Sequence, residues 1–300
     1  RSLADRWGEV KNVKDYGATG DGVTDDTAAF NTALATLAVR EVLHVPSGTY
    51  RITSELTEPA VTGWKMVGDG LDSKFDISGI GAATPLITVT RRAAQLRDFT
   101  VSGDSSALPN YTVHGIQVGT TAVGTSLNSI VNINFGSCAK ALIFNNAHDS
   151  THYDCAFYGV TTAVEFSTTQ STSQHFYNFH MQEVEQCVNL AINSGPQTWS
   201  SCTFAAYPYN AATVPLNFGT AIINLIITGC RFEHSDANSA GDTWDSLYVK
   251  GTDNTYPVHC LNLIGNYFTG QAVENHIHMD NYVKGGNILG NLFYRAPSNA

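Results

Sequence analysis

Short apolar runs that end in an aromatic residue recur along most of the chain. From residue 42 onward these runs are rich in Val, Ile, Thr, Phe and Tyr, and Gly, Asn, Asp and Ser separate them, as in short β-strands joined by turns. The closing residues are Phe99, Phe135, Phe157, Met181, Phe204, Phe232, Phe268 and Phe293, which we call the anchors. They lie 22 to 36 residues apart, so a period in the low twenties carries insertions. This spacing is too short for a four-stranded propeller blade and predicts one coil of a parallel β-helix.

The position two residues before each anchor also follows a pattern. It reads Ile133, Cys155, Phe179, Cys202, Cys230, Asn266 and Asn291. Strand side chains alternate in direction, so this position shares the inward side with the anchor. Three cysteines and two asparagines there predict internal ladders, with about 4.8 Å between stacked neighbours. The thiols then serve as small apolar groups, which we favour over a redox or metal role because the chain has no C-x-x-C pair. A second aligned strand follows in residues 139–142, 161–164 and 185–188.

One segment near the N-terminus has helical spacing. Apolar residues from Ala29 to Leu37 recur every three or four positions, which predicts a helix from about Asp25 to Ala38 with Thr24 or Asp25 as the N-cap. We therefore expect two parts: residues 1–40 as an N-terminal linker and capping helix, and residues 41–300 as the parallel β-helix domain.

Composition narrows the function classes. The 300 residues are 43% hydrophobic and carry a net charge of −10, so a sizeable core is expected and a disordered chain is excluded. The acidic balance argues against nucleic-acid binding, because phosphate contacts require Lys or Arg. The longest aliphatic stretch, Ala221 to Ile227, is far below the ~20 residues of a spanning helix, so no membrane insertion is expected. The start at Arg1, without Met or a signal sequence, suggests a fragment or a processed chain.

The segment from Val13 to Phe30, VKDYGATGDGVTDDTAAF, resembles the opening of pectate-lyase-like right-handed parallel β-helix proteins, and Leu43 to Tyr50 continues the likeness. The stretch RSLADRW before it is similar to bacteriophage tailspike and capsule depolymerase proteins. The resemblance implies an all-β, single-stranded right-handed parallel β-helix with an N-terminal capping α-helix. It also implies a homotrimer on the phage tail that acts on bacterial surface polysaccharide. The glycines between residues 17 and 22 do not indicate a phosphate loop, because no Lys-Ser or Lys-Thr follows them.

The residues on either side of the anchors face outward and form the candidate site. We expect sugar to be bound there by His180, Arg231, Tyr267, Tyr158, Gln182 and His234. Glycoside hydrolysis needs two carboxyl groups, about 5–5.5 Å apart for retention or about 6.5–9.5 Å for inversion. Glu233 is the first candidate, its partner is Asp236 or Glu183, and Asp154 is a further candidate. The sequence therefore predicts an endo-glycosidase that cleaves capsular or O-antigen glycan.

Several alternatives remain open at this point. A polysaccharide lyase would use Arg231, His180, Tyr267 and Tyr158 to neutralise a uronate and abstract a proton. A non-catalytic adhesin or a plain structural spike would use the same solenoid. We do not favour zinc at Glu274, His276 and His278, calcium, or an esterase at residues 103–106. No cofactor is predicted.

Overall fold

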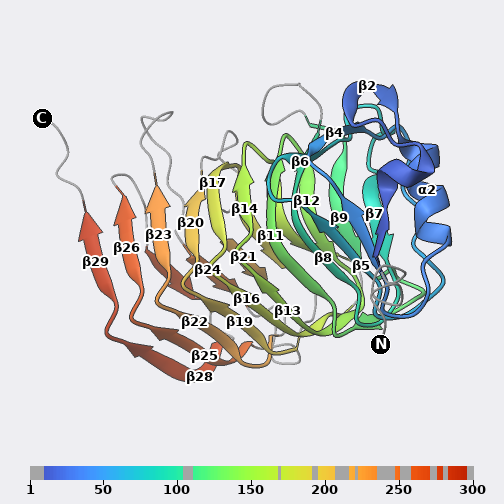
Figure 1. Ribbon diagram of the computed structural model, residues 1–300. Coiled ribbons are helices and arrows are strands. Elements are labelled where there is room, and N and C mark those ends of the chain that lie inside the picture. The colour runs from blue at the N-terminus through green and yellow to red at the C-terminus, as the bar shows by residue number, and fades with distance from the viewer. Residues whose placement is uncertain are drawn as a thin grey trace, which may run out of the picture.

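The computed structural model describes residues 10–103, 111–167, 170–190, 195–206, 216–219, 222–234, 247–250, 258–270, 276–279 and 283–295. These residues form a parallel β-solenoid whose coils stack from one end of the molecule to the other (Figure 1). The strands form a 21-stranded sheet and an 8-stranded sheet, and within each sheet neighbouring strands pair in parallel. The all-β solenoid prediction is confirmed.

Each complete coil contributes strands to three walls, and the large sheet makes the first two. The first wall contains β1 (Val10–Asn12), β3 (Val42–Val45), β5 (Lys65–Gly68), β8 (Gln95–Ser102), β10 (Thr125–Ser126), β11 (Ser129–Gly136), β13 (Ala147–Tyr153), β16 (Thr172–Tyr177), β19 (Gln197–Ser200), β22 (Leu225–Thr228), β25 (Val258–Ile264) and β28 (Val283–Leu289). The second wall contains the ends of β8 and β11 together with β2 (Asp21–Asp25), β4 (Gly48–Arg51), β6 (Ser73–Asp76), β14 (Ala156–Tyr158), β17 (His180–Val184), β20 (Thr203–Ala206), β23 (Arg231–His234), β26 (Tyr267–Gly270) and β29 (Leu292–Arg295). The third wall contains β7 (Pro85–Val89), β9 (His114–Val118), β12 (Lys140–Phe144), β15 (Thr162–Phe166), β18 (Gln186–Leu190), β21 (Leu216–Gly219), β24 (Leu247–Lys250) and β27 (Ile277–Met279).

The anchors from Phe135 onward lie in register on the second wall, as predicted. Phe135, Phe157, Met181, Phe204, Phe232, Phe268 and Phe293 pair in that order. The Phe99 anchor is wrong by two residues, because Phe99 pairs with Ile133 and Val101 pairs with Phe135. Both positions face the core, so inward alternation alone cannot tell them apart.

The predicted ladders of cysteine and asparagine are confirmed, at the corner between the first and second walls. Cys155, Cys202, Cys230 and Asn266 are all buried. The amide of Cys202 donates to Cys230 Sγ at 3.3 Å, and the amide of Cys230 donates to Asn266 Oδ1 at 2.9 Å. Asn291 Oδ1 accepts from the amide of Asn266 at 2.8 Å. Burial raises the pKa of Cys155 to about 12, so this thiol stays protonated and packs as an apolar group.

The helix α2 (Thr27–Ala35) is shorter than the predicted range, and the residue in the N-cap position is Asp26. The predicted Asp25 still supplies a capping acceptor, because its Oδ1 accepts from the amide of Thr27 at 3.0 Å. Asp26 makes no capping bond, because its carboxylate accepts from the amides of Thr19 and Gly20. The backbone N–H groups of Thr19 and Gly20 are therefore bonded to Asp26, whereas a phosphate-binding loop would point such N–H groups at its ligand.

The core side of α2 packs on the N-terminal coils, and Figure 1 shows the helix at that end of the stack. Phe30 lies edge-on to Tyr50 at 5.3 Å and to Phe75 at 5.2 Å between ring centroids. The 3-10 helix η1 (Val13–Tyr16) lies beside it. The capping role and the domain boundary at residue 40 stay predictions.

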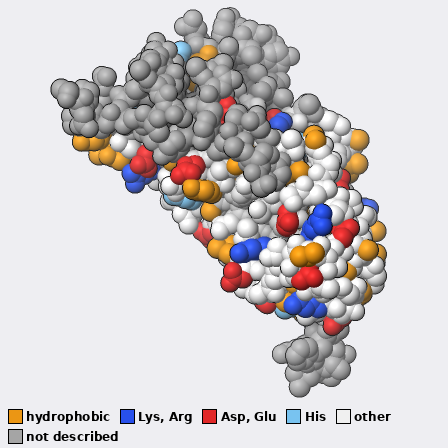
Figure 2. All heavy atoms as spheres, turned by 90° about the horizontal axis from the view of Figure 1, so that it is seen from above, with side chains coloured by type: hydrophobic (Ala, Val, Ile, Leu, Met, Phe, Trp, Pro, Cys, Tyr) orange, Lys and Arg blue, Asp and Glu red, His pale blue; other side chains and the backbone are white. Residues whose placement is uncertain are grey.

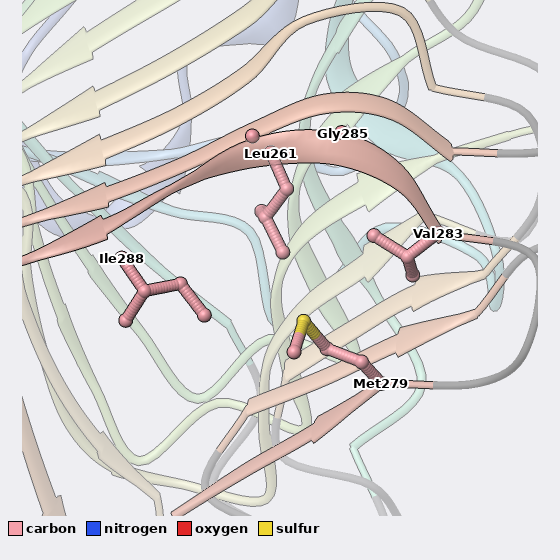
Figure 3. A pocket seen from close by; sticks show the side chains of 6 residues that line it. Leu261, Met279, Val283, Gly285 and Ile288 are labelled. Atoms are coloured by element: carbon pink, nitrogen blue, oxygen red, sulfur yellow. The ribbon is translucent and has the colours of Figure 1, made fainter.

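The last coils enclose a small apolar pocket of about 220 Å³ (Figure 3). It is lined by Leu261, Met279, Val283, Gly285, Gly286 and Ile288. Within the part of the chain that the structure describes, no helix has the length and apolar content needed to cross a bilayer.

Candidate functional site

The outward residues of the second wall form two parallel columns. Column one holds the residue before each anchor, and column two holds the residue after it. Column one is Asn134, Ala156, His180, Thr203, Arg231, Tyr267 and Leu292. Column two is Gly136, Tyr158, Gln182, Ala205, Glu233, Thr269 and Tyr294. The structure therefore brings six of the candidate residues onto one wall at the expected register.

Glu233 and Arg231 form an ion pair on β23. Arg231 Nη2 donates to Glu233 Oε1 at 3.1 Å, and the two side chains are 41% and 52% exposed for Glu233 and Arg231. Solvent screens a pair this exposed, so it adds little to folding stability. The pair places the carboxylate and the guanidinium side by side on the outer face of β23.

A second polar pair lies two coils below. His180 Nε2 and Gln182 Oε1 on β17 are 3.2 Å apart, and both side chains are exposed. Between the two pairs the columns carry Thr203, which is half-buried, and Ala205, which is only 7% exposed. Two coils correspond to about 10 Å, so the pairs flank a floor of small side chains.

Glu183 reaches this wall through a β-bulge. Strict alternation after the inward Met181 would turn Glu183 toward the core. The register instead shifts by one residue, with Gln182 pairing with Ala205 and Val184 pairing with Ala206. Since Met181 and Val184 are both buried, the two residues between them lie on the outer side. Glu183 adopts a positive φ of 51° in the bulge.

The remaining candidates lie elsewhere. Asp154 is exposed at the corner before β14, where its Oδ1 accepts from Asn178 Nδ2 of the next coil at 2.8 Å. Asp236 and the side chain of His234 lie outside the described residues, although the backbone of His234 pairs with Ala206. Tyr158 is 57% exposed in column two, and Tyr267 is half-buried beside Arg231 in column one.

The metal and esterase alternatives gain no support. The described residues contain no cluster of three or more His, Cys, Asp or Glu side chains arranged to hold a metal ion. The ring of His276 contacts Phe268 and Phe293, whereas His278 contacts Tyr248. Glu274 and the residues 104–106 lie outside the described part of the chain.

Both columns continue into the N-terminal coils, which the sequence analysis missed. Column one extends through Thr49, Lys74 and Thr100, and column two through Arg51, Asp76 and Ser102. The error came from aligning Phe99 in place of Val101. The available signal was the pair Tyr50 and Phe75, which occupy the anchor position of the two preceding coils.

A comparison of the sequence with family models identifies the family of the chain. Residues 10–214 match the family model described as "Rhamnogalacturonase A/epimerase, pectate lyase-like". The chain belongs to this pectate-lyase-like family. A curated glucan 1,3-beta-glucosidase from Cochliobolus carbonum is also 45% identical, but over only 58 residues, which are 15% of this chain and 7% of that protein.

Solved structures with this fold include phage proteins and a polysaccharide lyase. ORF18 of Geobacillus virus E2 superposes with a TM-score of 0.66 at 17% identity, covering 96% of this chain and 61% of that one. The enzymatically active domain of bacteriophage CBA120 tailspike protein 2 gives 0.59 at 15%, covering 94% and 45%. An alginate lyase from Paenibacillus sp. FPU-7 gives 0.69 at 9%, covering 90% and 96%. The pectate-lyase-like chain thus spans less than two thirds of the two phage chains, and at these identities the likeness concerns the fold.

Proposed function

We propose that this protein is an endo-acting depolymerase that hydrolyses a bacterial capsular or O-antigen polysaccharide. The observation that carries the proposal is the placement of Glu233 and Glu183 on the outer side of one wall, two coils apart, with a floor of small side chains between them. Membership of a pectate-lyase-like family and the fold shared with a tailspike support it.

The geometry favours an inverting mechanism. The backbones that carry the two acids are about 10 Å apart, because the two strands are two coils apart on one wall. Inversion requires carboxyl groups about 6.5–9.5 Å apart, which leaves room for the attacking water. One carboxyl group would protonate the leaving oxygen while the other activates water. His180, Gln182 and Arg231 would bind sugar hydroxyls, and Tyr158 and Tyr267 would stack on sugar rings.

A lyase that acts on a uronic-acid polymer is the second candidate, since a structural neighbour is an alginate lyase. Such a reaction would need the Arg231 guanidinium to neutralise the uronate, with His180 or a tyrosine as the base. Glu233 Oε1 already accepts from Arg231 Nη2 at 3.1 Å, and the negative charge of Glu233 beside the guanidinium would repel the uronate. For this reason we favour hydrolysis over elimination.

A panel of purified capsular and O-antigen polysaccharides tests the activity. New reducing ends alone indicate hydrolysis, whereas reducing ends together with ultraviolet absorbance of unsaturated uronates indicate elimination. The Glu233→Gln variant should lose cleavage by at least about 100-fold and keep its affinity for the polymer. The charge-matched control Asp15→Asn, at the exposed η1, should cleave normally. Equal cleavage by Glu233→Gln and the wild type would reject Glu233 as a catalytic group.

We also propose assembly as a homotrimer with the coils side by side, on a phage tail that acts at the bacterial surface. The shared fold with a tailspike supports this. Sedimentation equilibrium tests it, with a mass of three times 32.3 kDa expected and a stable monomer contradicting it.

A further inference from the structure

The second wall carries a polar hollow six coils from Glu233. It has a volume of about 410 Å³ and is lined by Thr49, Lys74, Asp76, Ser78, Ser102, Gly103 and Ser137. Lys74 and Asp76 lie two residues apart on β6 and belong to columns one and two. The hollow is therefore part of the same surface as the proposed cutting site.

The hollow lies where column two has only small residues. Ser102 and Gly136 follow Asp76 in the next two coils, and Tyr158 follows Gly136. The outer surface is thus low over two coils, with Asp76 on one side and an exposed tyrosine on the other. From Asp76 to Tyr158 is three coils, or about 14 Å.

The lining selects a polar ligand. Most ligand pockets are lined chiefly by apolar side chains, but this one has an ammonium, a carboxylate and four hydroxyl groups. Asp76 Oδ1 accepts from the amide of Ser78 at 3.0 Å, which holds the carboxylate in place. Within the described residues the Lys74 ammonium has no hydrogen bond or ion pair, so it can donate to a ligand.

Charge further narrows the ligand class. A phosphate or uronate drawn to Lys74 would be repelled by Asp76 in the same hollow. A neutral sugar has no such conflict, because its hydroxyls donate to the carboxylate and its oxygens accept from the ammonium. Seen from the side toward which the second-wall strands point, the described surface mixes acidic and basic side chains (Figure 2).

We propose that this hollow is a distal subsite for a neutral sugar residue of the polymer that the Glu233 wall would cut. The inference rests on the proposed function, and it adds the expectation that a long polymer binds more tightly than a short oligosaccharide. Column two runs from Asp76 through Tyr158 and Gln182 to Glu233 over six coils, about 29 Å. A long polymer can contact both places at once, whereas a short oligosaccharide contacts one.

Binding measured without cleavage tests the subsite. Three proteins are compared: the Glu233→Gln variant, and the same variant with Lys74→Ala or Asp76→Asn added. The affinity of each protein for each polysaccharide of the panel is measured by affinity electrophoresis. Each change should weaken polymer binding by about tenfold to a hundredfold, the value of a charged hydrogen bond. The matched control Lys284→Ala, an exposed lysine of β28 on the first wall, should leave affinity unchanged. Ser102→Ala provides a smaller change in the same hollow if either charge variant folds poorly.

Kinetics supply a second readout with Glu233 intact. Lys74→Ala should raise the KM for polymer with kcat unchanged, and short oligosaccharides should be cut as by the wild type. Equal polymer affinity in all variants would overturn the subsite, as would a panel in which nothing binds. Polymer that binds through Lys74 but is never cut would leave the subsite standing and reject the hydrolase.

Discussion

A buried histidine makes folding stability sensitive to pH. His152 on β13 has no exposed surface, and its ring packs 4.9 Å from Phe144 and 5.2 Å from Phe176 between centroids. Its Nδ1 accepts from the amide of Ile130 at 3.2 Å, so the proton of the neutral ring is on Nε2, which faces Gln174 Oε1 at 3.2 Å. The neutral ring satisfies both contacts, and a proton on Nδ1 would break the first.

Burial lowers the pKa of His152 from its usual 6.5 to about 4, with the Gln174 hydrogen bond opposing the effect. The unfolded chain therefore binds a proton at a higher pH than the folded chain does. Stability is at its full value above pH 6.5 and falls as the pH drops toward 4. The whole difference corresponds to about 3 kcal/mol, and about 2 kcal/mol of it is lost between pH 7 and pH 5.

Replacing His152 by Asn removes the titration and keeps an oxygen near the Ile130 amide. The lost ring should cost about 3–5 kcal/mol at pH 7, comparable to truncating a large core side chain. The informative quantity is the change between pH 7 and pH 5 in the free energy of unfolding, from urea titrations followed by tryptophan fluorescence. That change should shrink by about 2 kcal/mol in the variant. The exposed control His180→Asn should keep the wild-type pH dependence. An unchanged dependence in His152→Asn would refute the reasoning.

Three further substitutions follow from the contacts. Asn266→Ala leaves the buried Cys230 amide unpaired and should cost at least about 2 kcal/mol in urea titrations. The control Asn262→Ala, at a half-buried position of the first wall, should cost under about 1 kcal/mol, and equal costs would contradict the ladder. Gly20→Ala places a Cβ 2.9 Å from an aromatic ring, and Gly17→Ala meets nothing within 4 Å, so the first should lower the Tm more. Both have positive φ, so a smaller effect at Gly20 would reject the steric reason. Glu183→Gln should lower kcat by at least about 100-fold on the polymer that the wild type cuts, and full activity would exclude this acid.

The sequence predicted the solenoid because its coils repeat. A side chain that stacks on copies of itself leaves a periodic trace, and the ladder of Cys202, Cys230 and Asn266 was found that way. The repeat also predicted which residues flank the anchors. It was least reliable where the period stretched, as at Phe99, because a shift of two residues keeps the inward pattern intact.

Two local features of the structure could not be predicted in this way. The bulge at Glu183 adds one residue to a single strand, and alternation has no signal for it until the pairing with β20 is known. The start of the helix at Thr27 is a related case: Asp25 accepts from the Thr27 amide as predicted, but the carboxylate of the N-cap residue Asp26 bonds to the loop before the helix. Both depend on contacts between segments, which spacing along one strand does not encode.

The same geometry explains why a shared fold leaves the chemistry open. The core of each coil is fixed by inward residues such as Phe204 and Phe232, while the outward residues of the same strands meet only their neighbours above and below. An acidic residue can therefore be present on one coil in one protein and on another coil in a related protein, without any change in the core packing beneath it. The pair Glu233 and Glu183 depends on one bulge and two small floor residues, none of which the solenoid itself requires. Phage tailspikes and a polysaccharide lyase can thus have the same wall architecture with different outward residues, and the reaction of this chain must be read from its own columns.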